Sequence, residues 1–144
     1  MIKLHHINIV SPDVRGLDAF YQTAVGLERM APLPIKPIQG YNDGSPSAPK
    51  TPALFLAAGD DPEQLQLHLC APDQYLGVRY GHTFNPVSTG HIAYRCDDIA
   101  AAKRRLDDAG IPYSDYGEWA VKDWHQIFFL DPVGNVVEIH QVMR

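Results

Sequence analysis

The sequence has few cysteines, no long hydrophobic run and no excess of basic residues. Its two cysteines, Cys70 and Cys96, are too few for the disulfide framework of a small secreted domain. No apolar run approaches the roughly 20 residues that a membrane-spanning helix requires. The N-terminal MIKLHHINIV is too short and too polar for a signal peptide. We therefore expect a cytoplasmic protein that has no membrane partner.

Basic residues are outnumbered, with 12 Lys and Arg against 17 Asp and Glu and a net charge of −5. A weakly acidic surface repels phosphate backbones, so a nucleic-acid partner is not expected. The length of 144 residues, of which 45% are hydrophobic, corresponds to one domain with one sizeable core.

A weak internal repeat divides the chain into two halves. HINIVSPDVRGLDAFYQTAV at 6–25 aligns with HIAYRCDDIAAAKRRLDDAG at 91–110, which brings His6 opposite His91. Each segment begins as an alternating strand and continues into a helix. The helical stripes are Val14, Leu17, Phe20, Tyr21 and Ala24 in the first, and Ile99, Ala102, Leu106 and Ala109 in the second.

Strand patterns follow each predicted helix. We expect strands at 53–58 and 64–70 in the first half and at 112–116, 118–121, 124–130 and 136–142 in the second. Each half thus reads as β-α-β-β-β, although the second strand of the first half has no visible pattern. The predicted fold class is α+β, with a first module of about 1–70, a linker at 71–89 and a second module at 90–144.

The first half is longer because of residues 31–52, which contain six of the twelve prolines. Proline removes an amide donor and fixes φ, so a continuous central strand is not expected there. A loop of this length in a compact domain either covers a substrate or is a passive insertion, and the sequence leaves both open.

Alternation along the strands separates an apolar face from a face rich in lone pairs. Residues such as Ile7, Ile9, Ile92 and Leu65 are expected to pack under the helices. The opposite face then carries His6, Asn8, Gln66, His68, Cys70, His91, Arg95, Glu138 and His140. Imidazoles and a carboxylate at repeat-related positions are the donor set of a divalent transition metal.

The remaining histidines are expected to be structural. His5 has the opposite parity to His6, and His82 and His125 lie in or near loops. His140 has the right parity and is expected beside the ligands rather than among them. Arg95 could hold a substrate anion or pair with Glu138, and the sequence does not decide between the two.

Three segments carry a family resemblance, namely LHHINI, GHIAYRCDDI and IFFLDPVGNVVEIH. They resemble the vicinal oxygen chelate superfamily, which includes glyoxalase I, methylmalonyl-CoA epimerase, bleomycin-resistance proteins and extradiol dioxygenases. The resemblance implies two βαβββ modules that form one vicinal-oxygen-chelate domain over 1–144, with a curved mixed sheet around a metal. It also implies His6, His91 and Glu138 as ligands, Gln66 or His68 as the fourth position, a small-molecule substrate and a homodimer.

The fourth position separates three candidate functions. With His6, His91 and Glu138 as the only ligands, an extradiol-dioxygenase-like enzyme would use Fe²⁺ or Mn²⁺, with His68 as catalytic proton acceptor. With His68 as a fourth ligand, a lyase or isomerase of the glyoxalase I or epimerase type would use Zn²⁺, Ni²⁺ or Co²⁺. The third candidate is a metal-free drug-binding protein.

Two features depart from these families. Glyoxalases and epimerases place Glu or Gln at the fourth position, and the first module has no Glu there, so the base needed for proton abstraction is missing. Extradiol dioxygenases usually carry a Tyr on the penultimate strand, so His125, Tyr113 or Tyr116 would have to take its place.

Overall fold

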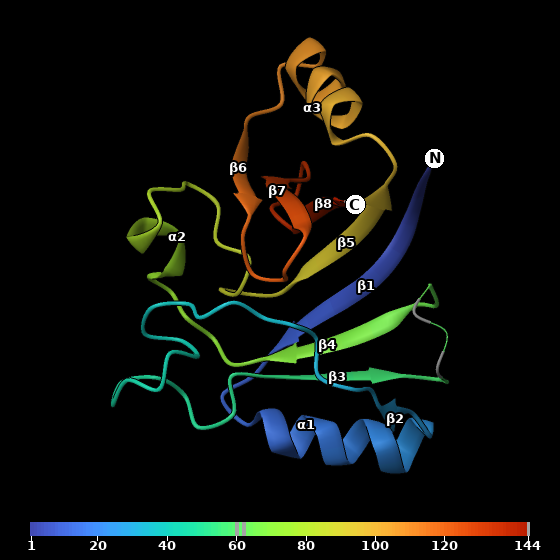
Figure 1. Ribbon diagram of the computed structural model, residues 1–144, viewed down its shortest axis with the longest axis vertical. Coiled ribbons are helices and arrows are strands. Elements are labelled where there is room, and N and C mark those ends of the chain that lie inside the picture. Colours follow the sequence, from blue (N-terminus) through green and yellow to red (C-terminus); the bar gives the residue numbers. More distant parts are fainter. Residues whose placement is uncertain (60, 62, 144) are drawn as a thin grey trace.

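A computed structural model of the chain describes residues 1–59, 61 and 63–143 as one curved, mixed sheet with few helices (Figure 1). The sheet has eight strands in the order β2-β3-β4-β1-β5-β8-β7-β6. The strands are β1 (Ile2–Val10), β2 (Glu28–Arg29), β3 (Ala53–Ala57), β4 (Gln66–Cys70), β5 (His91–Cys96), β6 (Tyr113–Glu118), β7 (Trp124–Leu130) and β8 (Val136–Val142). The helices are α1 (Val14–Phe20), η1 (Tyr21–Val25), α2 (Leu76–Arg79) and α3 (Ile99–Asp108).

The two repeat strands, β1 and β5, lie side by side in the middle of the sheet and run antiparallel. Each is flanked on its other side by a parallel strand from its own half, β4 beside β1 and β8 beside β5. The first strands of both halves and the last strands of both halves therefore come together at the centre. Among the described residues, no helix is long and apolar enough to span a bilayer.

An aspartate side chain caps the first turn of α1 and of α3. The carboxylate of Asp13 accepts a hydrogen bond from Gly16 N at 2.9 Å, and Asp98 accepts one from Ala101 N at 2.8 Å. Each aspartate therefore satisfies one amide that the first turn leaves free. The first helix widens into the π-helical segment η1 and ends at Gly26, whose φ of 78° is left-handed.

The predicted apolar stripe of the first helix is partly wrong. Val14 is buried, but the Phe20 side chain is 58% exposed and Ala24 is exposed. Asp18 is buried instead, because it pairs with Arg29 of the short strand β2. The helix packs mainly on β3 and β4, and Phe20 near its end lies outside the core. The second stripe is as predicted for Ile99, Ala102 and Leu106, which pack on β7 and β8; Ala109 is exposed.

Two predicted strands differ in extent. The second strand of the first half, which has no sequence pattern, is the two-residue β2. Residues 118–121 form no separate strand, because β6 continues to Glu118 and Val121 makes only an isolated bridge with Ile35.

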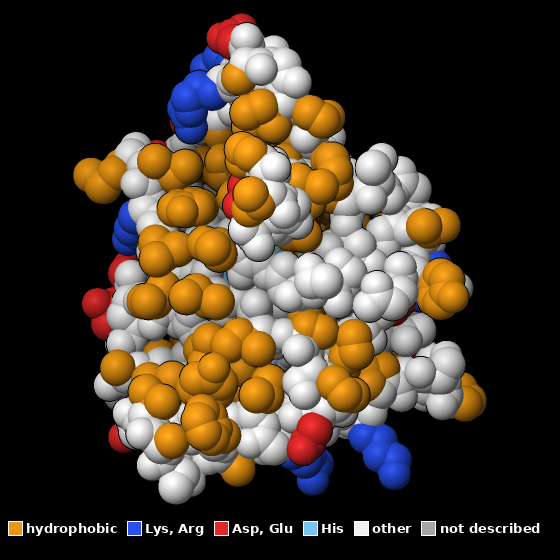
Figure 2. Space-filling view, turned by 180° about the vertical axis from the view of Figure 1, so that it is seen from behind, with side chains coloured by type: hydrophobic (Ala, Val, Ile, Leu, Met, Phe, Trp, Pro, Cys, Tyr) orange, Lys and Arg blue, Asp and Glu red, His pale blue; other side chains and the backbone are white. Residues whose placement is uncertain are grey.

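The outer face of the two central strands is less covered than the apolar pattern predicts. Ile7 and Ile92 lie opposite each other across β1 and β5 and are 37% and 39% exposed. Leu65 is also exposed. The helices cover the two ends of the sheet and leave its middle open, so the prediction that these residues pack under helices is wrong. Hydrophobic side chains are visible over much of the rear face in Figure 2.

The prediction that His5 and His6 lie on opposite faces of the sheet is wrong, because β1 contains a β-bulge. The register between β1 and β5 shifts between Leu4 and His6, so that one residue is inserted into β1. A bulge places neighbouring side chains on the same face of a sheet. His5 and His6 are therefore both buried, at 0% and 2% exposure.

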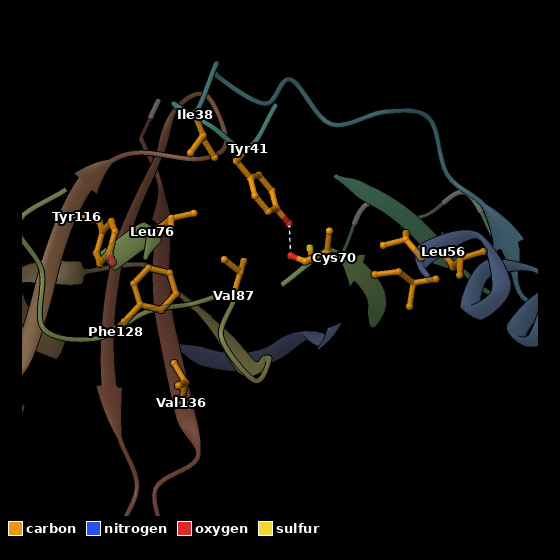
Figure 3. Packing of buried hydrophobic residues seen from close by; sticks show 12 residues of the cluster. Ile38, Tyr41, Leu56, Cys70, Leu76, Val87, Tyr116, Phe128 and Val136 are labelled. Carbon is orange, nitrogen blue, oxygen red and sulfur yellow. Dashed lines mark hydrogen bonds between the residues drawn. The ribbon is translucent and has the colours of Figure 1, made fainter. Parts of the chain in front are cut away.

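The proline-rich segment 31–52 packs over the inner face of the sheet. Ile38 and Tyr41 belong to the main hydrophobic cluster, together with Leu76 and Phe128 (Figure 3). The Tyr41 hydroxyl lies 2.9 and 2.8 Å from the backbone oxygens of Pro52 and Ala71, and its single proton is donated between these two acceptors. The segment is thus packed on the core through its apolar side chains.

Gly90 controls how the linker enters β5. Its φ is +89°, and a Cβ there would lie 2.4 Å from the backbone oxygen of Asn8. We expect Gly90→Ala to lower the free energy of unfolding by about 3 kcal/mol or more, because a strained φ and a backbone clash add together. Equilibrium urea unfolding measures this.

The matched control for Gly90 is Gly26→Ala. Gly26 also has a positive φ, of +78°, but nothing lies within 4 Å of its added Cβ. Gly26→Ala should lower the free energy of unfolding by only about 1 kcal/mol. Equal losses for the two variants would contradict the close approach of the linker to β1.

Candidate metal centre

Three buried side chains from three adjacent strands point their ligand atoms at a common point. His6 lies on β1, His91 begins β5, and Glu138 lies on β8. His6 Nε2 is 3.3 Å from His91 Nε2, and Glu138 Oε2 is 3.1 Å from His91 Nε2 and 3.7 Å from His6 Nε2. All three residues are at most 9% exposed.

These separations fit a bound divalent cation. Ligand atoms about 2.1 Å from a metal lie roughly 3.0 Å apart at octahedral angles and roughly 3.4 Å apart at tetrahedral angles. The ligand atoms of His6, His91 and Glu138 all lie within 4.8 Å of one another. One chain therefore supplies a three-ligand group that could hold a metal.

The other atoms of these three side chains are held by neighbours. His91 Nδ1 lies 2.7 Å from the backbone oxygen of Pro86, and His6 Nδ1 lies 3.0 Å from His5 Nδ1. Glu138 Oε1 accepts a hydrogen bond from Gln126 Nε2 at 3.2 Å. Partners of this kind fix ring orientation and leave His Nε2 and Glu138 Oε2 for a metal.

The strand register identifies His68 as the counterpart of Glu138. In the repeat, Asn8 corresponds to Ala93; Asn8 pairs with His68, and Ala93 pairs with Glu138. Gln66 pairs with His6 and therefore lies two residues before the position equivalent to Glu138. Of the two candidates for the fourth position, His68 thus occupies the equivalent site.

His68 nevertheless lies outside the three-ligand group. Its ring stacks on that of His6, with centroids 3.8 Å apart and planes 14° apart. Its Nε2 lies 2.9 Å from Gln66 Oε1, which accepts hydrogen bonds only. The neutral His68 therefore carries its proton on Nε2, and Nδ1 is the atom able to accept one.

Arg95 and His140 lie behind the three ligands, away from the cavity in front of them. Arg95 Nε donates to His140 Nε2 at 3.1 Å, and the Arg95 guanidinium pairs with Glu63 at 2.8 Å. Arg95 does not line the cavity in the part of the chain that is described, so this geometry does not fit a contact with a substrate anion. Asn8 does line it, and its Nδ2 donates to Cys70 Sγ at 2.9 Å.

Sequence reasoning missed three residues of the site. His5 supports His6, and only the bulge in β1 places it there, for which the sequence has no signal. Gln126 and Trp124 alternate on β7 toward the inner face. Applying strand alternation to WHQIFFL would have found them.

A cavity of about 120 Å³ lies in front of the three ligands. Aromatic and aliphatic side chains form most of its wall, and Ile35, Ile38 and Tyr41 of the 31–52 segment cover it. Glu138 is the only Asp, Glu, Lys or Arg among its described lining residues. Within the described part of the chain, Trp119 Nε1 and Asn8 Oδ1 are buried without a hydrogen-bond partner, and both residues line this cavity.

Burial keeps the imidazoles of His5 and His6 neutral. It lowers the pKa of His6 to about 4 and that of His5 to about 2. Burial alone would raise the pKa of Glu138, but the nearby His6, His140 and His91 together lower it well below its usual value. Neutral imidazoles and an ionised carboxylate are the protonation states that metal ligands require.

A family model described as Glyoxalase/Bleomycin resistance protein/Dioxygenase superfamily matches residues 5–129. No match was found among curated proteins. A methylmalonyl-CoA epimerase from Streptomyces coelicolor is similar in structure at a TM-score of 0.65 and 19% identity, with 99% of this chain and 98% of that chain covered.

Two further solved structures are similar. A methylmalonyl-CoA epimerase from Mycobacterium tuberculosis has a TM-score of 0.61 at 17% identity, over 98% of this chain and 88% of that chain. A glyoxalase/bleomycin resistance protein/dioxygenase superfamily member from Vibrio splendidus has a TM-score of 0.52 at 12% identity, over 98% of each chain. At these identities the likeness shows the fold alone.

The neutral histidines predict that acid destabilises the metal-free protein. Between pH 6.5 and about 4, the unfolded chain protonates His6 but the folded chain does not, so stability falls as pH falls. His6 alone contributes about 3 kcal/mol between pH 6.5 and about 4, and the buried His5 acts in the same direction, whereas the lowered pKa of Glu138 adds to the loss only below about pH 4.5. Urea midpoints measured from pH 7.5 to 5 should decline steadily.

A variant pair assigns this decline to the buried histidines. His5→Gln removes one of them and should flatten the decline. His125→Asn alters a ring that pairs with Asp115 outside the cluster and should keep the full decline. Urea midpoints that do not change with pH would contradict the buried neutral state.

Proposed function

Because this chain belongs to the Glyoxalase/Bleomycin resistance protein/Dioxygenase superfamily, we propose that it is a metal-dependent enzyme of the extradiol-dioxygenase type. Its substrate is a small molecule chelated through two oxygens. The observation that carries the proposal is the group of two histidines and one carboxylate, His6, His91 and Glu138, with ligand atoms 3.1–3.7 Å apart. When bound there, Fe²⁺ or Mn²⁺ would supply open positions for the substrate oxygens and O₂.

The residues that line the cavity favour oxidation over proton abstraction by a carboxylate. An epimerase or glyoxalase requires a base beside the metal. Glu138 is the only carboxylate among the described lining residues, and it belongs to the ligand group. A carboxylate that holds the cation is a poor base. The described lining therefore offers no residue for the role of a separate Glu base.

His68 is proposed as the proton acceptor. It lines the same cavity as the three ligands, and its Nε2 is engaged by Gln66. Nδ1 is then the atom that takes a proton from a substrate hydroxyl. Gln66 orients the ring, and Asn8 offers Oδ1 to a substrate donor because that atom has no hydrogen-bond partner among the residues that the structure describes.

The cavity favours a small, largely apolar and uncharged substrate. Its volume of about 120 Å³ is below the 300–1,000 Å³ that is usual for drug-sized ligands. The absence of Lys and Arg from its described lining gives no counter-ion for a phosphate or carboxylate. Trp119 and Phe128 offer aromatic walls to a ring-sized molecule.

A lyase or isomerase that uses Zn²⁺, Ni²⁺ or Co²⁺ is the second candidate. The register equivalence of His68 and Glu138 favours it, because His68 stands where a fourth protein ligand would come from. In that case His68 is a ligand, and Glu138 is the labile base. The two candidates therefore make opposite predictions for His68 variants.

Three further properties are proposed. Residues 1–144 form one domain of two modules, about 1–70 and 90–144, joined by the linker 71–89. The protein acts in the cytoplasm. It is a homodimer, and the exposed Ile7 and Ile92 on the outer face of the sheet are candidates for its contact.

Metal analysis of purified variants tests the assignment of ligands. We expect His91→Ala to lose bound metal, because it removes one of three donors. His68→Ala should keep the metal and lose turnover. His125→Ala is the control, since that ring lies outside the group. Loss of metal from His68→Ala would favour the lyase or isomerase, and a wild-type protein that binds no metal would overturn both.

Oxygen uptake tests the reaction type. The protein is loaded with Fe²⁺ under anaerobic conditions and mixed with catechol-type substrates in an oxygen electrode cell. We expect substrate-dependent oxygen uptake that His68→Ala lowers by at least about 100-fold, the range of a lost general base. Iron-loaded protein that consumes no oxygen with any of these substrates would count against the dioxygenase.

A further inference from the structure

Behind the three ligands, a row of side chains connects Glu138 to the surface of the protein. It begins at the half-exposed Glu63, which pairs with Arg95 at 2.8 Å. Arg95 Nε then donates to His140 Nε2 at 3.1 Å, and His140 Nδ1 lies 2.8 Å from Glu138 Oε1, a close contact whose angles in the described part of the chain are not those of a hydrogen bond. His140 and Glu138 are 0% and 1% exposed, so water does not compete for the contact between these two residues.

The contact with Arg95 determines the tautomer of His140. A guanidinium remains protonated and only donates hydrogen bonds, so His140 Nε2 must accept with its lone pair. A ring whose Nε2 is unprotonated carries its single proton on Nδ1. His140 therefore directs its only N–H group to the side of Glu138.

Glu138 then has one oxygen with donors beside it and one oxygen free for a metal. Oε1 lies near His140 Nδ1 and accepts from Gln126 Nε2 at 3.2 Å. Oε2 lies 3.1 Å from His91 Nε2 and 3.7 Å from His6 Nε2. The two sides of the carboxylate thus meet different partners.

The same contact excludes a second metal at a neighbouring histidine group. His5, His6 and His140 also bring ligand atoms within 4.8 Å of one another. With Nε2 engaged by Arg95 and Nδ1 protonated, His140 has no lone pair to offer a cation. The positive charge of Arg95 beside it also opposes a second cation.

The first module has no equivalent of this row. Arg95 and His140 pair in the register of β5 and β8, and the corresponding pair in β1 and β4 is Val10 and Cys70. The first module thus has neither the cation nor the imidazole at these positions. The row accompanies Glu138 and is absent beside its counterpart His68.

We propose that Arg95 is a positioning residue that acts through His140 to make Glu138 a one-oxygen ligand. Arg95 is itself held by Glu63 and lies 5.0 Å from the centre of the Trp124 ring, on which His140 stacks at 4.2 Å. A one-oxygen carboxylate leaves one more coordination position for substrate than a two-oxygen carboxylate does. The role in metal binding rests on the proposed metal centre, whereas the tautomer does not.

The tautomer can be read directly in the metal-free wild-type protein. Long-range ¹H–¹⁵N NMR correlation spectra of ¹⁵N-labelled protein distinguish Nδ1–H from Nε2–H rings. We expect His140 as the Nδ1–H tautomer. His140 protonated on Nε2, or on both nitrogens, would overturn the inference whether or not the protein binds a metal.

Variants test the link from Arg95 to the metal. Zn²⁺ affinity is measured by competition with a chromophoric chelator. Arg95→Met should weaken Zn²⁺ binding about 10- to 100-fold, as for other supports of ligands, and should mix the His140 tautomers. Arg95→Lys, which keeps a cationic donor, should restore part of both. Arg104→Met alters an exposed arginine on α3 and is the matched control.

The outcomes distinguish a failure of the proposed metal centre from a failure of the proposed role of Arg95. If wild-type protein binds no Zn²⁺, the proposed metal centre fails while the tautomer result stands. If it binds Zn²⁺ and both Arg95 variants bind equally well with unchanged tautomer, the inference fails. Circular dichroism of each variant checks folding, and if Arg95→Met does not fold, Arg95→Lys and the wild-type spectrum still decide.

Discussion

The structure depends on the burial of three groups that water would otherwise solvate, namely two imidazoles and a carboxylate. Their ligand atoms lie 3.1–3.7 Å apart with almost no exposure. An ionised group in an apolar interior is costly unless a counter-charge or hydrogen bonds compensate it. Here Gln126 and neighbouring histidines hold Glu138, and Pro86 and His5 hold the two imidazole rings. A divalent cation at the common point would complete the compensation.

The sheet provides this arrangement through its pairing. Antiparallel β1 and β5 bring the first strands of both halves together, and parallel β4 and β8 bring the last strands alongside them. Residues that are far apart in sequence thereby share one concave face. The helices cover the outer face only at the ends of the sheet, where they pack on β3, β4 and β8. The exposed Ile7 and Ile92 follow from this, because no helix reaches the middle.

The two halves differ in the residues around the candidate metal centre. The proline-rich segment occurs only in the first half and packs its Ile38 and Tyr41 over the cavity. Glu138 with Arg95 and His140 occurs only in the second, opposite His68 with Val10 and Cys70 in the first. A duplicated frame with unlike side chains is suited to the proposed asymmetric metal site, in which one half would supply an anionic ligand and the other the proposed neutral base.

The sequence by itself determined the repeat, the strands at 124–130 and 136–142, and the shared face of His6, His91 and Glu138. These follow from local periodicity, which depends on neighbouring residues. The tertiary structure alone decided the burial of His5, the exposure of Ile7, the register equivalence of His68 and Glu138, and the partners of Arg95. A bulge, strand register and helix coverage decide these, and each depends on contacts between residues distant in the chain, which alternation along one strand does not contain.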